Sequence, residues 1–193
     1  MKDATMRILF LTLVLILPSA SQASPADDFW SRLQALCGEA FEGELIEAPE
    51  GENGFAGKRL LMHVRECSEQ RIRIPFVVGE DRSRTWVLTR HDDRIELRHD
   101  HRHADGTPDE ITMYGGASTN AGRPDVQYFP ADERTRRTIE AAFSNVWMMR
   151  IEPGETFSYG LRRLGTSRVF RIDFDLSDAV DPPPAPWGWE AGQ

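Results

Sequence analysis

The chain has 193 residues and a formal net charge of −8, because 31 acidic residues outnumber 23 basic ones. A net-negative surface repels phosphate backbones, and no Lys/Arg cluster interleaved with aromatic residues offsets it, so nucleic acid is not an expected partner. The longest apolar run, Ile8–Leu17, is about half of the ~20 residues that a membrane-spanning helix needs. We therefore expect a protein with no membrane span.

The first residues have the three parts of a secretory signal peptide. Lys2 and Arg7 give a positive head, and the apolar run Ile8–Leu17 follows them. Ser21 and Ala23 then put small residues at the positions that a signal peptidase recognises. We expect removal of residues 1–23 and export to the periplasm or to the outside of the cell. A buried N-terminal helix is the alternative for this segment.

Both cysteines, Cys37 and Cys67, follow the predicted signal. In an exported protein an even number of cysteines indicates disulfide bonding. Neither cysteine has a C-x-x-C spacing around it, which disfavours a redox or metal-binding role. We therefore expect one Cys37–Cys67 disulfide, which in the chain-entropy view stabilises the fold by about 3 to 4 kcal/mol.

Residues 24–193 are long enough for one domain with a substantial core, and we expect that domain at 24–180. It should begin with a short helix, because Ser24 is a suitable N-cap, Pro25 suits the first helical position and Gly38 ends an apolar pattern of helical spacing. The remaining residues, 181–193, are rich in Pro and Trp. Such a tail cannot form a helix or a central strand and should lie extended along the surface.

After the helix, apolar residues alternate with their neighbours at the period of two that is typical of half-buried strands. Turn signals such as Pro153-Gly154 separate the alternating stretches. Pro75 lies inside one of them, which indicates a sheet edge or a bulge there. The pattern predicts about nine strands, at 41–46, 60–65, 71–78, 85–90, 94–101, 110–114, 145–151, 157–163 and 168–176.

One stretch interrupts the strands. Pro130, two acidic residues in a first turn and an apolar side made of Ile139, Ala142 and Phe143 predict an inserted helix at 130–143. Short antiparallel strands joined mostly by tight turns hide their edges most economically in a closed or nearly closed up-and-down barrel. We therefore predict a mainly β fold, a single antiparallel barrel-like meander with an N-terminal helix and one inserted helix. A β-sandwich is the alternative.

The order of elements, a helix leading into Phe41-Glu42-Gly43 and then a β meander, resembles the calycin group of lipocalin-like ligand carriers, although the Gly-x-Trp start of lipocalins is missing. The string RHDHRHADG, from Arg98 to Gly106, is similar to exported bacterial proteins of unassigned function. The first resemblance implies a barrel that carries a ligand. Neither resemblance assigns a role to a particular residue.

The histidine-rich string is the strongest chemical signal in the chain. In a strand, residues two apart face the same way, so His99, His101 and His103 should continue the apolar face of Ile95 and Leu97. Histidines on such a face indicate a polar end of the barrel interior, where barrels place ligand or metal sites. Neighbouring imidazoles on one face are about 6.7 Å apart along the strand, so two of them can share a metal ion.

The sequence thus predicts a metal site made of two of these three histidines and a ligand from elsewhere. Zinc, copper or non-haem iron suits imidazole and carboxylate ligands. A solvated cluster of hydrogen bonds and ion pairs is the alternative for the histidines. The charged stretch Gly79–Trp86 is a second candidate site, but we expect it to be a solvated loop between strands. The candidates for the additional ligand are His63, Asp105, Asp109 and Glu110.

Two functional classes fit this pattern. A binding module would take up a small ligand or a metal ion, whereas a metal-dependent enzyme would also need an open coordination position and an acid or base such as Asp105 or Glu110. A third class, an envelope protein-interaction or inhibitor module, would use the Pro/Trp tail. No G-x-S-x-G, P-loop, H-E-x-x-H or dinucleotide motif occurs. The catalytic set is incomplete, so the sequence favours the binding module.

Overall fold

The computed structural model describes residues 23–51, 54–92 and 94–189. Residues 1–22, which hold nearly all of the predicted signal peptide, lie outside the described residues. Within the described ranges, the helices are too short or too polar to cross a membrane.

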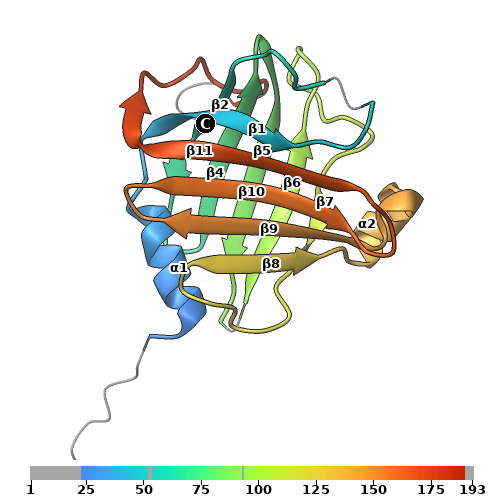
Figure 1. Cartoon of the computed structure of the whole chain (residues 1–193), viewed down its shortest axis with the longest axis horizontal. Helices are drawn as coiled ribbons and strands as arrows, with labels where there is room; N and C mark the ends of the chain where they lie inside the picture. Colours follow the sequence, from blue (N-terminus) through green and yellow to red (C-terminus); the bar gives the residue numbers. More distant parts are fainter. Residues whose placement is uncertain (1–22, 52–53, 93, 190–193) are drawn as a thin grey trace, which may run out of the picture.

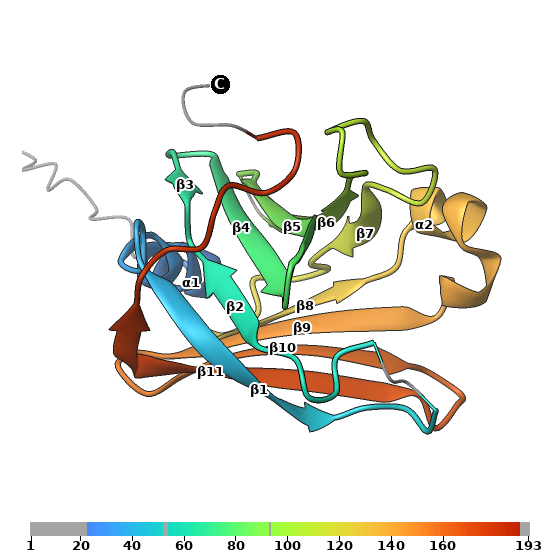
Figure 2. The same ribbon diagram turned by 90° about the horizontal axis from the view of Figure 1, so that it is seen from above.

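The described strands form one antiparallel sheet of 11 strands that curls into a nearly closed barrel (Figure 1). Ten strands follow one another in the order β7-β6-β5-β4-β2-β1-β11-β10-β9-β8, and β3 pairs with β4. Seen from above, β4 to β7 and β8 to β11 form opposite walls (Figure 2). The predicted mainly β, barrel-like fold is therefore confirmed. The strands are β1 (Ala40–Glu47), β2 (Leu60–His63), β3 (Glu66–Cys67), β4 (Arg71–Val78), β5 (Asp81–Arg90), β6 (Ile95–His101), β7 (Tyr114–Ala117), β8 (Val126–Pro130), β9 (Asn145–Glu152), β10 (Thr156–Arg163) and β11 (Val169–Val180).

Alternation of side chains places the core between these walls. In β9, Trp147, Met149 and Ile151 are buried, and the residues between them are half-buried on the outer side. On the facing wall, the Trp86 ring of β5 stacks on that of Tyr159, with 4.3 Å between the ring centroids. Aromatic rings from both walls thus fill the barrel, and their burial supplies much of the driving force for folding.

Helix α1 (Pro25–Gln34) closes one end of the barrel, and the helix labelled α2 lies at the opposite end (Figures 1 and 2). A capping box begins α1: the Ser24 backbone N–H donates to Asp27 Oδ2 over 2.9 Å, and the Asp27 N–H donates to Ser24 Oγ over 3.2 Å. Phe29, Trp30 and Leu33 on its inner face are completely buried. The helix therefore seals this end of the core against water.

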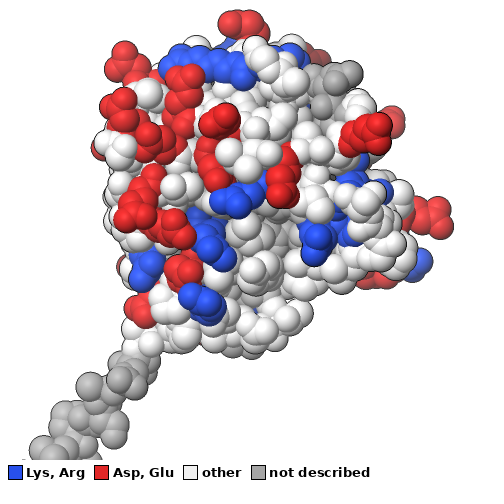
Figure 3. Space-filling view, in the orientation of Figure 1, with Lys and Arg blue, Asp and Glu red and all other residues white. Residues whose placement is uncertain are grey.

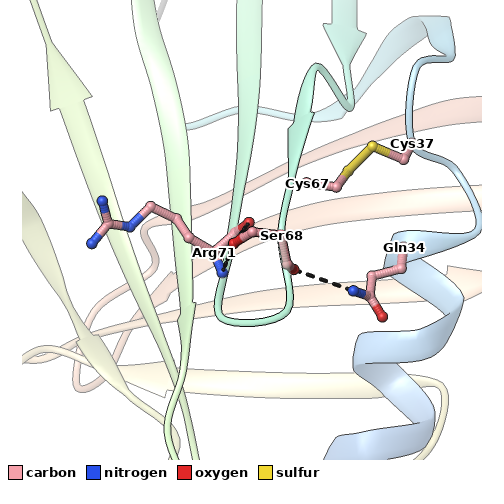
Figure 4. The surroundings of a disulfide bond; sticks show 5 residues. All are labelled: Gln34, Cys37, Cys67, Ser68 and Arg71. Carbon is pink, nitrogen blue, oxygen red and sulfur yellow. Dashed lines mark hydrogen bonds between the residues drawn. A yellow bond between two sulfur atoms is a disulfide. The ribbon is translucent and has the colours of Figure 1, made fainter. Parts of the chain in front are cut away.

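The predicted disulfide is present and fastens α1 to the sheet (Figure 4). The Cα atoms of Cys37 and Cys67 are 6.2 Å apart. Cys67 lies in the short strand β3, which the sequence-based assignment did not include. Beside the bridge, Gln34 Nε2 donates to the Ser68 carbonyl oxygen over 3.2 Å, so the end of α1 is held at two points.

Pro75 sits where β4 changes partner. Residues 76–78 of β4 pair with β2, and residues 72–73 pair with β3, so Pro75 has no strand partner on that side. A proline has no N–H to donate. Because no residue of β2 or β3 lies opposite Pro75, no carbonyl on that side is left without a donor. Strand β4 lies inside the sheet, so Pro75 is not on an edge strand, but an irregularity of the predicted kind lies beside it, where the β4–β5 register shifts between Phe76 and Val78.

The seam between β7 and β8 is closed by the turn and helix that follow β8. Helix α2 (Glu133–Thr138) is capped by Asp132, whose Oδ1 accepts from the Thr135 N–H over 2.9 Å. The Thr135 hydroxyl donates to the Gly115 carbonyl over 2.6 Å and accepts from the Gly115 N–H over 2.7 Å. A Cβ atom on Gly116 would lie 1.8 Å from the Pro130 carbonyl oxygen, so only glycine permits this approach.

The described part of the tail, residues 181–189, runs over the outside of the barrel without helix or strand. The centroid of its Trp189 ring is 4.0 Å from the guanidinium carbon of Arg73 and 4.4 Å from that of Arg102. The indole N–H donates to Asp100 Oδ2 over 3.0 Å. Cation–π contacts and one hydrogen bond therefore hold Trp189 on the barrel.

The structure corrects three details of the sequence-based assignment. The predicted strand at 110–114 is mostly loop, and β7 begins only at Tyr114. Strands β3 and β8 were not expected, and Pro130 ends β8 instead of beginning a helix. The predicted helix at 130–143 is α2 followed by a 3-10 turn, η1 (Glu140–Ala142). Ile139 separates the two because its backbone is extended, with φ −139° and ψ 89°.

The outer surface over β1, β11 and β10 carries acidic and basic side chains side by side (Figure 3). Several are paired along or between strands, such as Arg171 with Asp173 over 2.6 Å and Arg59 with Glu42 over 2.9 Å. Such exposed pairs are solvated and contribute little to stability.

Candidate functional site

A pocket of about 290 Å³ opens at the end of the barrel away from α1. The pocket includes Asn145 and Trp147 at the start of β9, whereas Arg32 of α1 reaches Ile151 at the far end of the same strand. Its wall is largely aromatic, and the rings come from β4, β5, β7, β9, β10, β11 and the β1–β2 connection. These aromatic residues are Phe55, Phe76, Trp86, Tyr114, Trp147, Tyr159 and Phe170.

Strand pairing explains why the histidines reach this pocket. In the register of β5 and β6, Trp86 lies opposite His99, and Arg84 lies opposite His101. Residues two apart share a face, so all four side chains point into the barrel. Ile95 and Leu97, on the same face of β6, are completely buried deeper inside. The predicted shared face is correct for His99 and His101.

His99 is fixed by a hydrogen bond at each ring nitrogen. Its Nδ1 is 3.1 Å from the Tyr114 carbonyl oxygen, and its Nε2 is 2.7 Å from the Tyr159 hydroxyl. A carbonyl oxygen can only accept, so Nδ1 carries the proton, and Nε2 accepts from Tyr159. Only 4% of His99 is exposed, and this burial lowers its pKa to about 3. The imidazole is therefore neutral at physiological pH.

His101 lies nearer to the mouth, with Nε2 3.0 Å from the Tyr114 hydroxyl. Burial and then the nearby Arg84 guanidinium lower the pKa of His101. Burial also raises the pKa of Tyr114 to about 12 and that of Tyr159 well above its usual value. The inner site therefore presents neutral imidazoles and protonated hydroxyls, groups that orient a ligand without adding charge.

Among the described residues that line the pocket, the charged side chains are three arginines at its rim. Arg84, Arg163 and Arg168 line the mouth. Arg84 pairs with Asp81 over 2.5 Å. Arg163 Nε donates to Asn145 Oδ1 over 2.9 Å. The pocket is thus aromatic inside and cationic at the opening.

His103 lies outside the pocket, which corrects its predicted place beside the other two histidines. Strand β6 ends at His101, and the chain then turns, with the His103 N–H donating to the Thr107 carbonyl over 2.9 Å. The alternation of faces stops with the strand, so His103 is exposed.

The additional ligand candidates are dispersed. His63 pairs with Ala40 in the β1–β2 ladder and does not line the pocket. Asp105 accepts from Thr107 in the exposed turn, and Asp109 accepts from the Ile111 N–H over 2.8 Å. Glu110 is exposed. The described residues contain no group of three or more His, Cys, Asp and Glu side chains placed to hold a metal ion.

Sequence reasoning missed most of the site. Tyr159, Arg163 and Asn145 meet the histidines because the sheet curls and brings β9 and β10 to face β6. Tyr114 instead lies opposite His99 on the neighbouring strand β7. Arg84 belongs to the charged stretch that was expected to be a solvated loop, but it lies in β5 and lines the pocket. The alternating pattern that begins at the next residue, Thr85, was the available signal, because Arg84 is two residues before the inward-facing Trp86.

No protein-family model, no curated protein and no solved structure matches this chain.

Proposed function

We propose that the protein is an exported binding protein whose barrel mouth takes up one small, largely aromatic ligand. One observation carries this proposal: a pocket of about 290 Å³ has an aromatic wall built from both sides of the barrel and polar groups at fixed positions. Small-molecule sites in proteins have this composition. A cavity of about 150 Å³ can admit benzene, so the pocket is suited to a ligand of about two rings.

Export is supported by the signal-like residues at the start of the chain and by the Cys37–Cys67 disulfide. Metal binding through His99 would cost the hydrogen bond from Tyr159, because the Nε2 lone pair is already used. The ring of His101 is hydrogen-bonded to the Tyr114 hydroxyl, which can donate or accept and so does not fix the tautomer. Metal binding by His101 therefore stays a prediction. The aromatic pocket needs no rearrangement of either histidine to receive an organic ligand.

The proposal is tested with three naphthalene probes of similar size. These are the neutral 2-naphthamide, the anionic 2-naphthoate and the cationic 2-naphthylmethylammonium, each titrated by calorimetry into the protein. We expect saturable binding of at least one probe with one site per chain, because the pocket can accept a bicyclic ring. No binding of any probe would contradict the proposal.

A matched pair of variants locates the binding. Ile139 lies at the rim of the pocket, so Ile139→Trp should fill the mouth and abolish binding. Ile111 is 48% exposed and lies outside the pocket, so Ile111→Trp should leave binding unchanged. Thermal melting of both variants checks that each one is folded. Equal binding by the folded Ile139→Trp protein would place the ligand elsewhere.

A further inference from the structure

The opening of the pocket has a charge opposite to that of the molecule. The chain has 31 acidic and 23 basic residues, yet its described pocket lining contains three arginines and no carboxylate. Arg84 comes from β5, Arg163 from the end of β10 and Arg168 from the turn before β11. Three separate segments therefore bring guanidinium groups to the mouth, and among them Arg163 has a neutral hydrogen-bond partner, Asn145.

The charge of Arg163 is held in place by a neutral group. Its Nε donates to Asn145 Oδ1 over 2.9 Å, which fixes the guanidinium but does not neutralise it. Among the described residues no carboxylate forms an ion pair with Arg163. Arg84 keeps a partner in Asp81, which lies outside the lining. His99 and His101 are neutral, so they do not add to the positive charge.

The groups below the rim are flat and partly polar. The His99 and Tyr114 rings stack with 4.7 Å between their centroids, and the Trp86 and Tyr159 rings stack with 4.3 Å between theirs. Planar walls favour a planar ligand, because ring faces and edges then meet over a large area. The small volume of about 290 Å³ favours a compact ring system over a long flexible chain.

We propose that the ligand is a small aromatic acid, with its carboxylate bound by Arg163 at the mouth and its ring against Trp86 and Trp147 inside. This inference rests on the proposed function and adds the chemical class of the ligand. A guanidinium binds a carboxylate through two parallel N–H···O hydrogen bonds, and the partly buried rim strengthens them relative to water.

Calorimetry with the same three probes tests the class of ligand. We expect 2-naphthoate to bind roughly tenfold or more tightly than 2-naphthamide, and the ammonium probe to bind most weakly, because the rim attracts anions. Equal affinities of the three probes, all abolished by Ile139→Trp, would overturn the acid class and leave the binding function intact. No binding of any probe would overturn both proposals.

Adjacent arginines on β10 provide a matched control. Arg163→Met keeps the length of the side chain and removes its charge, so 2-naphthoate binding should weaken roughly tenfold while 2-naphthamide binding stays unchanged. Arg162 is exposed and does not line the pocket, so Arg162→Met should bind both probes normally. Arg163→Lys restores a positive charge and should recover part of the preference. Unchanged selectivity in the folded Arg163→Met protein would contradict the role of Arg163.

Discussion

His99 ties the stability of the fold to pH. Its pKa is about 3 in the folded protein, because burial disfavours the imidazolium, against the ordinary value of 6.5 that applies in the unfolded chain. Below pH 6.5 the unfolded state therefore binds a proton that the folded state does not, and the folded state loses stability as pH falls. His63 and His101 have pKa values lowered by burial and act in the same direction.

We predict that His99 alone lowers the free energy of unfolding by about 2 kcal/mol between pH 7 and pH 5. Urea unfolding of the wild type and of His99→Phe at both pH values measures this contribution. The variant should be less stable at pH 7, because Tyr159 loses its acceptor, but it should have the shallower pH dependence. His103→Gln is the control, since the exposed His103 should leave the slope unchanged. Identical slopes for wild type and His99→Phe would show that His99 takes up its proton in the folded state.

At the scale of elements, Thr135 joins the two ends of the sheet. One hydroxyl satisfies both the N–H and the carbonyl of Gly115, and these groups are buried. We predict that Thr135→Val lowers the free energy of unfolding by about 1 to 3 kcal/mol, because the buried Gly115 N–H loses its acceptor, while the Gly115 carbonyl keeps only its hydrogen bond from the Asp132 N–H. Chemical denaturation measures the loss.

Thr138 allows a comparison within the same helix. Its hydroxyl donates only to the Arg134 carbonyl of its own helix, so Thr138→Val should change stability by less than about 0.5 kcal/mol. Equal effects of the two substitutions would mean that the loss reflects helix propensity and not the closure of the seam.

The same seam shows where sequence reasoning succeeds and where it stops. Long strands with strict alternation, such as β9, were predicted because the polarity of each residue indicates whether its side chain faces the core or the solvent. Strand β7 contains Gly115 and Gly116, which usually indicate a bend, and here they permit a close approach to β8 and the turn after it. That approach depends on a partner distant in sequence, and local pattern carries no information about it.

Sequence reasoning likewise predicted one part of the candidate site and missed the other. The inward direction of His99 and His101 followed from strand periodicity, and the end of β6 removed His103 from their face. Whether two histidines form a metal site or part of an organic pocket depends on which groups arrive from other strands. Tyr159 and Arg163 arrive through barrel closure, and Tyr114 and Arg84 arrive from the strands on either side of β6. The pattern of one strand specifies neither kind of neighbour.

For the whole molecule, the disulfide is the covalent link between the helix that closes the barrel and the sheet. We predict that replacing Cys37 and Cys67 together with alanine lowers the free energy of unfolding by about 3 to 4 kcal/mol, mainly by giving freedom back to the unfolded chain. Urea unfolding of the double variant and of the wild type, both without reductant, measures the difference. Addition of dithiothreitol should reduce the stability of the wild type toward that of the double variant and leave the double variant unchanged. A reduced wild type as stable as the oxidised one would contradict this role.

The pairing of β1 with β11 fixes the order in which this barrel can be completed. Strand β1 is synthesised before the other described strands, and its neighbour on one side, β11, is the last of them. Until Val169–Val180 arrives, β1 and β10 both keep an unpaired edge and an uncovered apolar face. The barrel can therefore close only when β11 has been synthesised. Before that, the incomplete chain exposes strand edges and apolar surface and is prone to associate with other copies of itself. The protein is thus most exposed to aggregation in the interval between the synthesis of β1 and that of β11.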